Sequence, residues 1–260
     1  MKKPKAAVIL FPGTNCEEET ARSCISVGMD ADILRWNTKE DLSSYDGFVL
    51  PGGWSYEDRV RAGAVASKDR IMETIKKEAK GGKPVLGICN GAQILIETGI
   101  VPGIKNDIQM ALAKNINPLI SGYYCTWVNI KNNPSNCIFT KSLGKGEIIP
   151  IPIAHGEGRF TTKEEGLLEQ LIKNSQVVFK YCDEKGETID KFPINPNGSI
   201  NNIAGLCNPE GNVLAMMPHP ERCCWNRQLP GFERKSFQEM NDPGPGRKLF
   251  QAMKEYIEGR

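Results

Sequence analysis

The stretch 83–93, KPVLGICNGAQ, constrains the fold of this chain more than any other. Its apolar run ends in Gly87-Ile88-Cys89-Asn90-Gly91, which predicts a buried strand that turns sharply into a helix at the cysteine. Such a bend holds the thiol at its tip, beside the N-terminus of the helix. There the helix dipole and the unpaired backbone N–H groups favour the thiolate, the form that attacks carbonyl carbons. We therefore interpret Cys89 as a catalytic nucleophile.

Strand-like and helix-like segments alternate in the N-terminal part of the chain. The predicted strands are residues 6–11, 31–36, 48–50 and 84–88, and the predicted helices are residues 17–27 and 68–80. This order predicts an α/β fold with a parallel, doubly wound sheet. Ligands bind beyond the carboxyl ends of the strands in such sheets, so we expect Pro12-Gly13, Gly52-Gly53 and Cys89 to border one cleft.

The second half of the chain is β-rich. Strand-like runs joined by turns cover residues 123–131, 147–153, 177–181, 203–207 and 213–217. Residues 223–246 are polar, lack a clear period, and are interpreted as a surface insertion before a final helix over 247–257. The sequence contains no repeat or linker that would divide it, so we expect a single domain over residues 1–260.

Charge and hydropathy exclude several kinds of partner. The 33 Lys and Arg residues nearly balance the 31 Asp and Glu residues, and no five like charges follow one another, so a nucleic-acid partner is not expected. No apolar stretch reaches the ~18 residues that a membrane span requires. The first residues also lack the apolar core of a secretory signal, so we expect a cytoplasmic protein without membrane contact.

The nine cysteines are scattered through the chain. They form no C-x-x-C pair, and no histidine stands at the spacing of a zinc ligand, so no metal site is predicted. We expect most of these thiols to be small buried apolar groups, which leaves Cys89 distinguished by its turn.

A cysteine nucleophile needs a base, and the chain has only two histidines, His155 and His219. His219 follows a predicted strand in MMPHPER, between prolines that should exclude a helix and keep the backbone extended. Side chains at positions i and i+2 of an extended segment point the same way, so Glu221 can orient the imidazole of His219. Cys89, His219 and Glu221 then form a catalytic triad. His155 could be a second base or a structural histidine.

An oxyanion hole should lie beside this triad. The backbone N–H of Asn90 and that of Gly52 or Gly53 are the expected donors, although the two glycines could equally serve to close a turn. Gln93 lies one helical turn after Cys89 and could bind a polar end of the substrate or simply face solvent. Cys89 alone could be a core cysteine and His219 alone a loop histidine, but their combination with residues 51–53 favours an active site.

Longer motifs give the chain a resemblance to a known family. GICNGAQIL and MMPHPE resemble the class I glutamine amidotransferases. FPGTNCEEE, VLPGGWSYEDRVRAGAVAS and IPIAHGEGRF resemble, more narrowly, the glutaminase subunits of phosphoribosylformylglycinamidine synthase, an enzyme of purine biosynthesis. The similarity covers most of residues 6–222. It implies a flavodoxin-like, three-layer fold with a mostly parallel central sheet flanked by helices.

The resemblance also assigns residues. The nucleophile, histidine and glutamate of the family match Cys89, His219 and Glu221, and the oxyanion glycine falls in Gly52-Gly53. The substrate-contacting glutamine matches Gln93, and the loop that closes over glutamine matches His155, Gly156 and Glu157. His155 is thereby implied to be a pocket residue and not the proton carrier.

The family reaction converts L-glutamine to glutamate and ammonia through a thioester on the nucleophile. The ammonia passes to an ATP-dependent synthetase subunit, which works with a small bridging subunit to make formylglycinamidine ribonucleotide. This chain shows no P-loop pattern, so ATP and Mg²⁺ are expected in the partner and no cofactor is expected here.

Two other functions remain open. One is a Cys-His hydrolase or deglycase on a similar sheet, which would share the turn at Cys89 but have no reason to keep HGEGRF. The other is a non-catalytic scaffold subunit, against which the intact triad argues.

Overall fold

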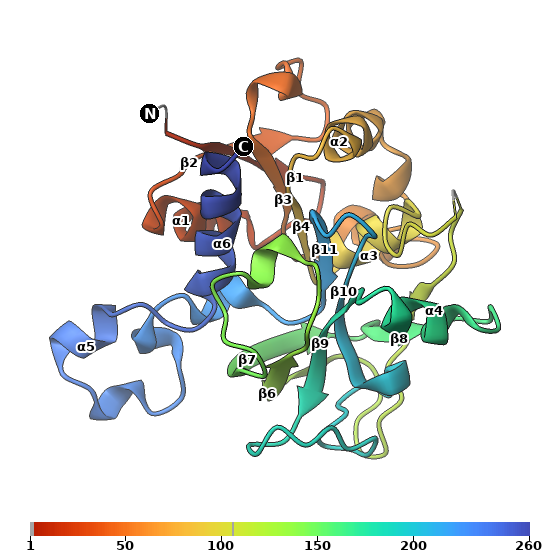
Figure 1. Cartoon of the computed structure of the whole chain (residues 1–260), viewed down its shortest axis with the longest axis vertical. Coiled ribbons are helices and arrows are strands. Elements are labelled where there is room, and N and C mark those ends of the chain that lie inside the picture. The colour runs from red at the N-terminus through yellow and green to blue at the C-terminus, as the bar shows by residue number, and fades with distance from the viewer. Residues whose placement is uncertain (1–2, 106) are drawn as a thin grey trace.

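The computed structural model describes residues 3–105 and 107–260. Its main sheet has nine strands in the order β2-β1-β3-β4-β11-β10-β9-β6-β7 (Figure 1). In chain order these strands are β1 (Lys5–Leu10), β2 (Asp30–Arg35), β3 (Gly47–Leu50), β4 (Val85–Ile88), β6 (Tyr124–Asn132), β7 (Ile148–His155), β9 (Val177–Cys182), β10 (Ile203–Cys207) and β11 (Val213–Met216). A second, two-stranded sheet pairs β5 (Ala111–Ala113) with β8 (Arg159–Thr161).

Six α-helices lie in the described part of the chain. They are α1 (Glu17–Ser26), α2 (Arg70–Lys80), α3 (Asn90–Glu97), α4 (Leu167–Lys173), α5 (Phe237–Asn241) and α6 (Arg247–Glu258). Among the residues described, none of these helices combines the length and the apolar character needed to cross a membrane.

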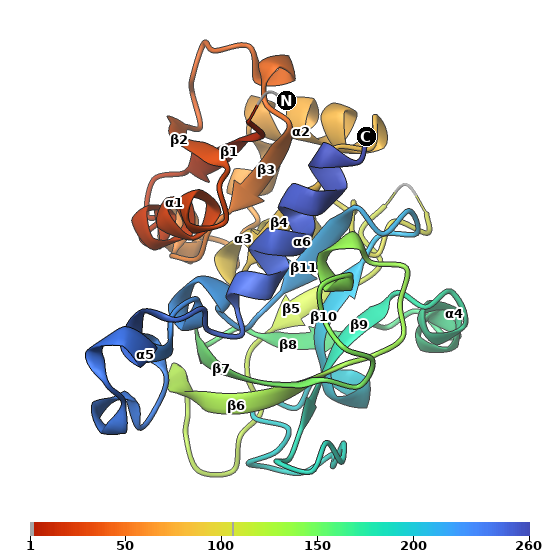
Figure 2. The same ribbon diagram turned by 60° about the vertical axis from the view of Figure 1, so that its left-hand side comes forward.

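The half of the sheet from β2 to β11 is parallel. Helices α1 and α6 cover one of its faces, and α2 and α3 lie on the other (Figure 2). The burial of α2 follows its helical period, because Ile71, Met72, Ile75 and Ala79 share its inner side. Strands β3 and β4 are covered on both faces and are fully buried, which explains their continuous apolar sequences. The predicted α/β fold is confirmed.

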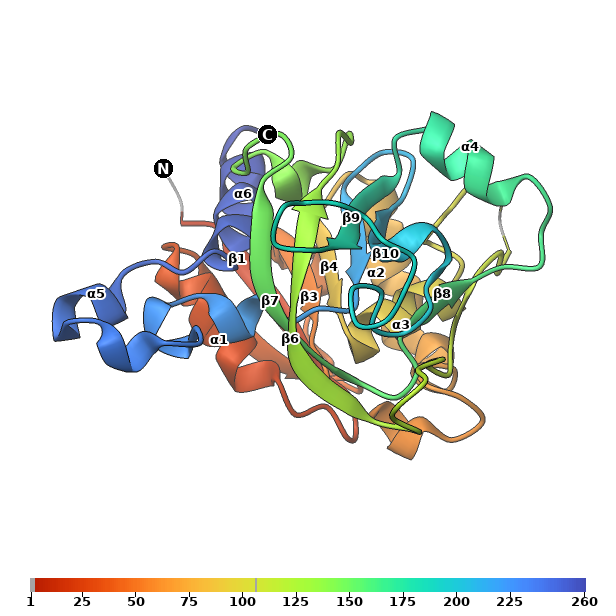
Figure 3. The same cartoon turned by 90° about the horizontal axis from the view of Figure 1, so that it is seen from below.

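The other half of the sheet is antiparallel and accounts for the β-rich second half of the sequence. Strand β10 pairs with β11 and β9, and β6 pairs with β9 and β7. The long strands β6 and β7 run side by side at the edge of the sheet (Figure 3). Tyr124 at the start of β6 faces His155 at the end of β7, so this edge contributes residues to the same region as the parallel half.

Strand order brings the predicted site residues together. Strands β3, β4 and β11 are adjacent and parallel, so the segments that follow them leave the same edge of the sheet. These segments carry Gly52, Cys89 and His219. The Cys89 N–H donates to the carbonyl of Met216 at 2.8 Å, which continues the β4–β11 pairing up to the predicted nucleophile.

Residues 225–242 project from the body of the molecule and carry α5 (Figures 1 and 2). An isolated bridge between Trp225 and Pro243 closes the base of this projection. The projection falls within the segment that the sequence suggested as a surface insertion.

Candidate active site

The turn between β4 and α3 places Cys89 in a strained backbone conformation. Its φ is 50° and its ψ is −104°, a region that residues with a side chain rarely adopt. The two flanking glycines make this turn possible. A Cβ on Gly91 would lie 1.9 Å from the Leu50 carbonyl oxygen, and one on Gly87 would lie 2.7 Å from the Gly91 oxygen. The turn therefore requires glycine at positions 87 and 91. Backbone strain of the kind seen at Cys89 is typical of functional sites.

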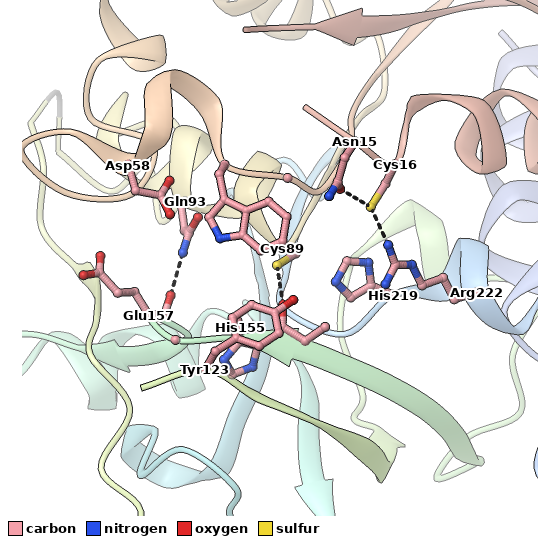
Figure 4. A pocket seen from close by; sticks show the side chains of 14 residues that line it. Asn15, Cys16, Asp58, Cys89, Gln93, Tyr123, His155, Glu157, His219 and Arg222 are labelled. Atoms are coloured by element: carbon pink, nitrogen blue, oxygen red, sulfur yellow. Dashed lines mark hydrogen bonds between the residues drawn. The ribbon is translucent and has the colours of Figure 1, made fainter. Parts of the chain in front are cut away.

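One pocket of about 270 Å³ collects most of the predicted site residues (Figure 4). Those that line it are Gly53, Cys89, Gln93, His155, Gly156, Glu157 and His219. The Cys89 side chain is only 5% exposed but borders this pocket, with its Sγ 3.5 Å from the carbonyl oxygen of Ala154. The sulfur is therefore reachable from the pocket and shielded elsewhere.

His219 and Glu221 form a buried pair behind the sulfur. His219 Nδ1 lies 2.6 Å from Glu221 Oε1, and the side chains are 2% and 0% exposed. Burial by itself lowers the pKa of His219, but the Glu221 carboxylate and the Cys89 sulfur raise it, and the net pKa lies well above the usual 6.5. The geometry favours a protonated imidazole at neutral pH.

The segment after His219 corrects one expectation. It does not stay extended, because residues Pro220–Cys223 form a 3₁₀ turn. Proline is favoured at the first position of a helical turn, where no N–H is needed, so Pro220 starts this turn instead of excluding it. His219 itself is extended, with φ −103° and ψ 90°, and Glu221 still reaches its ring.

Gly52 does not line the pocket but determines how closely the reactive groups approach. A Cβ there would lie 2.8 Å from His219 Cε1 and 3.5 Å from Cys89 Cβ. Within the part of the chain that the structure describes, the backbone N–H groups of Gly53 and Asn90 donate to no acceptor. They are available to a developing oxyanion.

Gln93 and Asn90 form an amide network at the floor of the pocket. Gln93 Nε2 donates to the Glu157 carbonyl at 2.6 Å, and Asn90 Nδ2 donates to Gln93 Oε1 at 2.9 Å. Asn90 Oδ1 accepts from the Ser55 N–H at 3.1 Å. The Gln93 side chain thus fixes the loop that borders the pocket, in addition to facing the space where a substrate would lie.

His155 lies buried at the pocket with a lowered pKa. Burial and the nearby charge of His219 lower its pKa to about 3. Its Nδ1 lies 3.2 Å from Asn115 Oδ1, and a Cβ on Gly158 would overlap its ring. A histidine with so low a pKa does not accept a proton at neutral pH, so His155 is not expected to act as a second base.

Sequence reasoning missed Asp58, which lines the pocket next to Glu157. Burial and the charge of Glu157 raise the pKa of Asp58 to about 6. Asp58 follows Tyr56 and Glu57 in a turn where all three residues have positive φ, and such a turn cannot be inferred from residue type. The sequence feature that could have indicated Asp58 is its position within the motif VLPGGWSYEDRVRAGAVAS, in which only the glycines were assigned a role.

Cys16 and Arg222 were missed as well. Both line the pocket, and Arg222 Nη2 donates to Cys16 Sγ at 3.0 Å. Arg222 also lies 3.4 Å from Glu19. The motif FPGTNCEEE contained Cys16, but only folding brings it against His219.

Comparison with known proteins gives a consistent result. A family model described as CobB/CobQ-like glutamine amidotransferase domain matches residues 3–257. The chain is 48% identical to phosphoribosylformylglycinamidine synthase subunit PurQ of Methanothrix thermoacetophila, over 98% of this chain and 99% of that protein. It is 45% identical to the subunit of the same name from Aquifex aeolicus, over 84% of this chain and 90% of that protein.

A solved structure of PurLQS from Thermotoga maritima contains a chain with the same arrangement. That chain is 32% identical to this one, and the match covers 98% of this chain and all of that one with a TM-score of 0.76.

The buried carboxylate should control the proton on His219. Changing Glu221 to Gln removes the charge that raises the pKa of His219, so His219 should lose its proton at lower pH than in the unsubstituted protein. With only two histidines in the chain, NMR titration of isotopically labelled histidine can follow each ring. Turnover should fall less than in His219→Asn, where roughly 10²–10⁴-fold is expected to be lost.

Glu19→Gln is the matched control, because it removes a nearby carboxylate that contacts Arg222 and not His219. An unchanged pKa of His219 in Glu221→Gln would show that the carboxylate does not set the charge of the ring.

Proposed function

The chain belongs to the CobB/CobQ-like glutamine amidotransferases and, among them, to the family of phosphoribosylformylglycinamidine synthase subunit PurQ, and we propose that Cys89, His219 and Glu221 carry its reaction. It is the glutaminase subunit of a synthase of purine biosynthesis. The observation that supports this assignment of residues most strongly is the convergence of the strained thiol and the buried His–Glu pair on one pocket. The alternatives of a deglycase or a scaffold subunit are not retained.

The first chemical step forms a thioester. The Cys89 thiolate attacks the side-chain carbonyl carbon of glutamine, and the N–H groups of Gly53 and Asn90 bind the oxyanion. The tetrahedral intermediate collapses as the C–N bond breaks, and the His219 imidazolium donates a proton to the departing ammonia.

The second step consumes water. Neutral His219 takes a proton from a water molecule, which attacks the γ-glutamyl thioester. The C–S bond then breaks, the new γ-carboxyl group loses the second water proton to solvent as glutamate leaves, and the Cys89 thiolate and the His219 imidazolium are restored. Glu221 holds the ring in one orientation and stabilises its charge throughout.

Asp58 and Glu157 are suited to bind the amino end of the substrate. Their carboxylates lie on the side of the pocket away from His219, with Cys89 between (Figure 4). The guanidinium of Arg61, which also feels the charge of Glu157, donates two hydrogen bonds of 2.6 Å to the Glu97 carboxylate. Among the residues that the structure describes, neither Asp58 nor Glu157 forms an ion pair, so these carboxylates fit the α-ammonium group of glutamine.

The ammonia that the reaction releases requires a partner protein to receive it. Ammonia becomes ammonium in neutral water and is then no longer a nucleophile, so the product is useful only if a partner receives it directly. The name PurLQS of the solved relative is that of an assembly. We expect this chain to act with a synthetase subunit that binds ATP and Mg²⁺, and with a small bridging subunit. A cytoplasmic location fits its nine free cysteines.

Replacing Cys89 with alanine should abolish glutamine-dependent synthesis by the assembled complex and leave synthesis from ammonium salts intact. The alanine cannot form the thioester, whereas the partner's chemistry needs only ammonia. Both rates are measured in the same preparation, with Cys125→Ala, a change at an exposed free thiol, as control. Glutamine-dependent synthesis that survived in Cys89→Ala would contradict the assignment of the nucleophile.

Changing Asp58 to Asn should reduce kcat/KM for L-glutamine roughly 10- to 100-fold, because it removes one hydrogen-bonded charge from the ammonium site. The same change should alter kcat/KM for glutaramate, which lacks the α-amino group, much less. In the unsubstituted enzyme kcat/KM for glutamine should also decline as the pH falls through about 6, where Asp58 gains a proton.

Glu57→Gln is the control, since it neutralises the adjacent and exposed carboxylate that pairs with Arg59. Equal losses for glutamine and glutaramate in Asp58→Asn would mean that Asp58 supports the pocket without contacting the ammonium group.

A further inference from the structure

Two aromatic side chains, Trp54 and Tyr123, line the catalytic pocket and have no part in the reaction proposed above. Trp54 follows β3 and Tyr123 precedes β6, so they come from the parallel and the antiparallel halves of the sheet. Their ring centroids are 5.7 Å apart and their planes are inclined by 33°. This separation is typical of a favourable aromatic contact. The two halves of the sheet therefore meet at the pocket through this pair of rings.

The pair lies on the solvent side of the pocket. Trp54 is 43% exposed and Tyr123 is 47% exposed, whereas Cys89 and His219 are only 5% and 2% exposed. Figure 4 shows the Tyr123 ring next to Cys89. Because the two rings contact each other, border the pocket and face solvent, they form an aromatic cover over the buried reactive groups.

The charges that act on Tyr123 locate its hydroxyl group along the pocket. Burial and the negative charge of the Cys89 thiolate raise the pKa of this hydroxyl, whereas the positive charges of His219 and Arg222 act to lower it. The hydroxyl is therefore within range of the sulfur and of the imidazole that we propose as the proton carrier. This is the end of the pocket from which the amide nitrogen of the substrate departs.

The space under the aromatic cover is small. The pocket holds about 270 Å³, which is below the ~300–1,000 Å³ of pockets that bind drug-sized ligands. With its amino group at Asp58 and Glu157 and its carbonyl carbon at Cys89, glutamine would direct its amide nitrogen toward the end that Tyr123 borders. A nitrogen that carries only hydrogen atoms fits there, whereas a substituent on it would compete with the rings for space.

We propose that Trp54 and Tyr123 determine which leaving group the site accepts, so that the enzyme hydrolyses primary γ-amides and rejects γ-amides substituted on nitrogen. This inference rests on the proposed role of Cys89 and defines the substrate class of that site. The chemistry alone does not impose the restriction. With a γ-N-alkylglutamine the C–N bond would break in the same way, His219 would protonate the departing alkylamine, and the same thioester would form.

The first test compares kcat/KM for γ-N-methyl-L-glutamine with kcat/KM for L-glutamine in the assembled complex, with glutamate release as the readout. The ratio of methylamide to glutamine should rise at least about tenfold in Tyr123→Ala, because about that much discrimination comes from a single carbon in a tight pocket. Tyr123→Phe retains the ring and should retain the ratio of the unsubstituted protein. Trp54→Ala should raise the ratio as well, so the test stands even if Tyr123→Ala fails to fold.

Leu119→Ala is the matched control, since Leu119 lies in the same segment before β6, is 77% exposed and does not line the pocket. Its ratio should equal that of the unsubstituted protein. An unchanged ratio in Tyr123→Ala would overturn the proposal. An equal rise in Tyr123→Phe would overturn it too, because the phenylalanine ring still covers the pocket.

The second test does not depend on turnover. Cys89 in the full-length chain is alkylated with iodoacetamide or with the larger N-phenylmaleimide, and the rate of each reaction at Cys89 is followed by peptide mass spectrometry. The ratio of the maleimide rate to the iodoacetamide rate should rise at least about tenfold in Tyr123→Ala, because the rings exclude the larger reagent. An unchanged ratio would contradict a cover over the sulfur. That failure would leave the proposed function standing, because the function is tested by Cys89→Ala.

Discussion

The buried hydrogen bond between His219 and Glu221 is the interaction on which the proposed active site depends. Neither side chain is exposed enough for water to replace its partner, so the carboxylate stabilises the charged imidazole and the imidazole neutralises a carboxylate that would otherwise be buried alone. The hydrogen bond between the two side chains therefore holds the imidazole ring of His219 in a fixed position. The strained turn at Cys89 then brings the sulfur to that place, and the glycines at 52, 87 and 91 leave the space for it.

The two halves of the sheet contribute different parts of the site. The parallel half carries the groups that we propose to react, because β3, β4 and β11 end side by side and the segments after them supply the backbone N–H groups, the thiol and the imidazole. The antiparallel half supplies residues that line the pocket, since β7 ends at His155 and leads into the loop that contains Glu157. Gln93 joins the halves by holding that loop from α3.

The sequence predicted those structural elements that are determined by the residues close to them in the chain. Periodicity identified the strands and helices of the parallel half to within a few residues, and the glycines around Cys89 identified the turn because they are a steric necessity. The pairing of His219 with Glu221 was predictable from their separation, although the 3₁₀ turn at Pro220 was not. What could not be predicted depends on long-range packing. Asp58 reaches the pocket through three successive positive φ angles, Cys16 meets His219 only in the folded chain, and the hydrogen bonds of Gln93 depend on where the 156–157 loop lies.

The most direct test of this account is to trap the covalent intermediate. The enzyme would be mixed with L-glutamine, quenched in acid within the turnover time, digested, and its cysteine peptides examined by mass spectrometry. The account predicts a γ-glutamyl group on the peptide that contains Cys89 and on none of the peptides that carry only the other eight cysteines. A glutamyl group on another cysteine, or turnover with no thioester at Cys89 under conditions that trap thioesters, would contradict it.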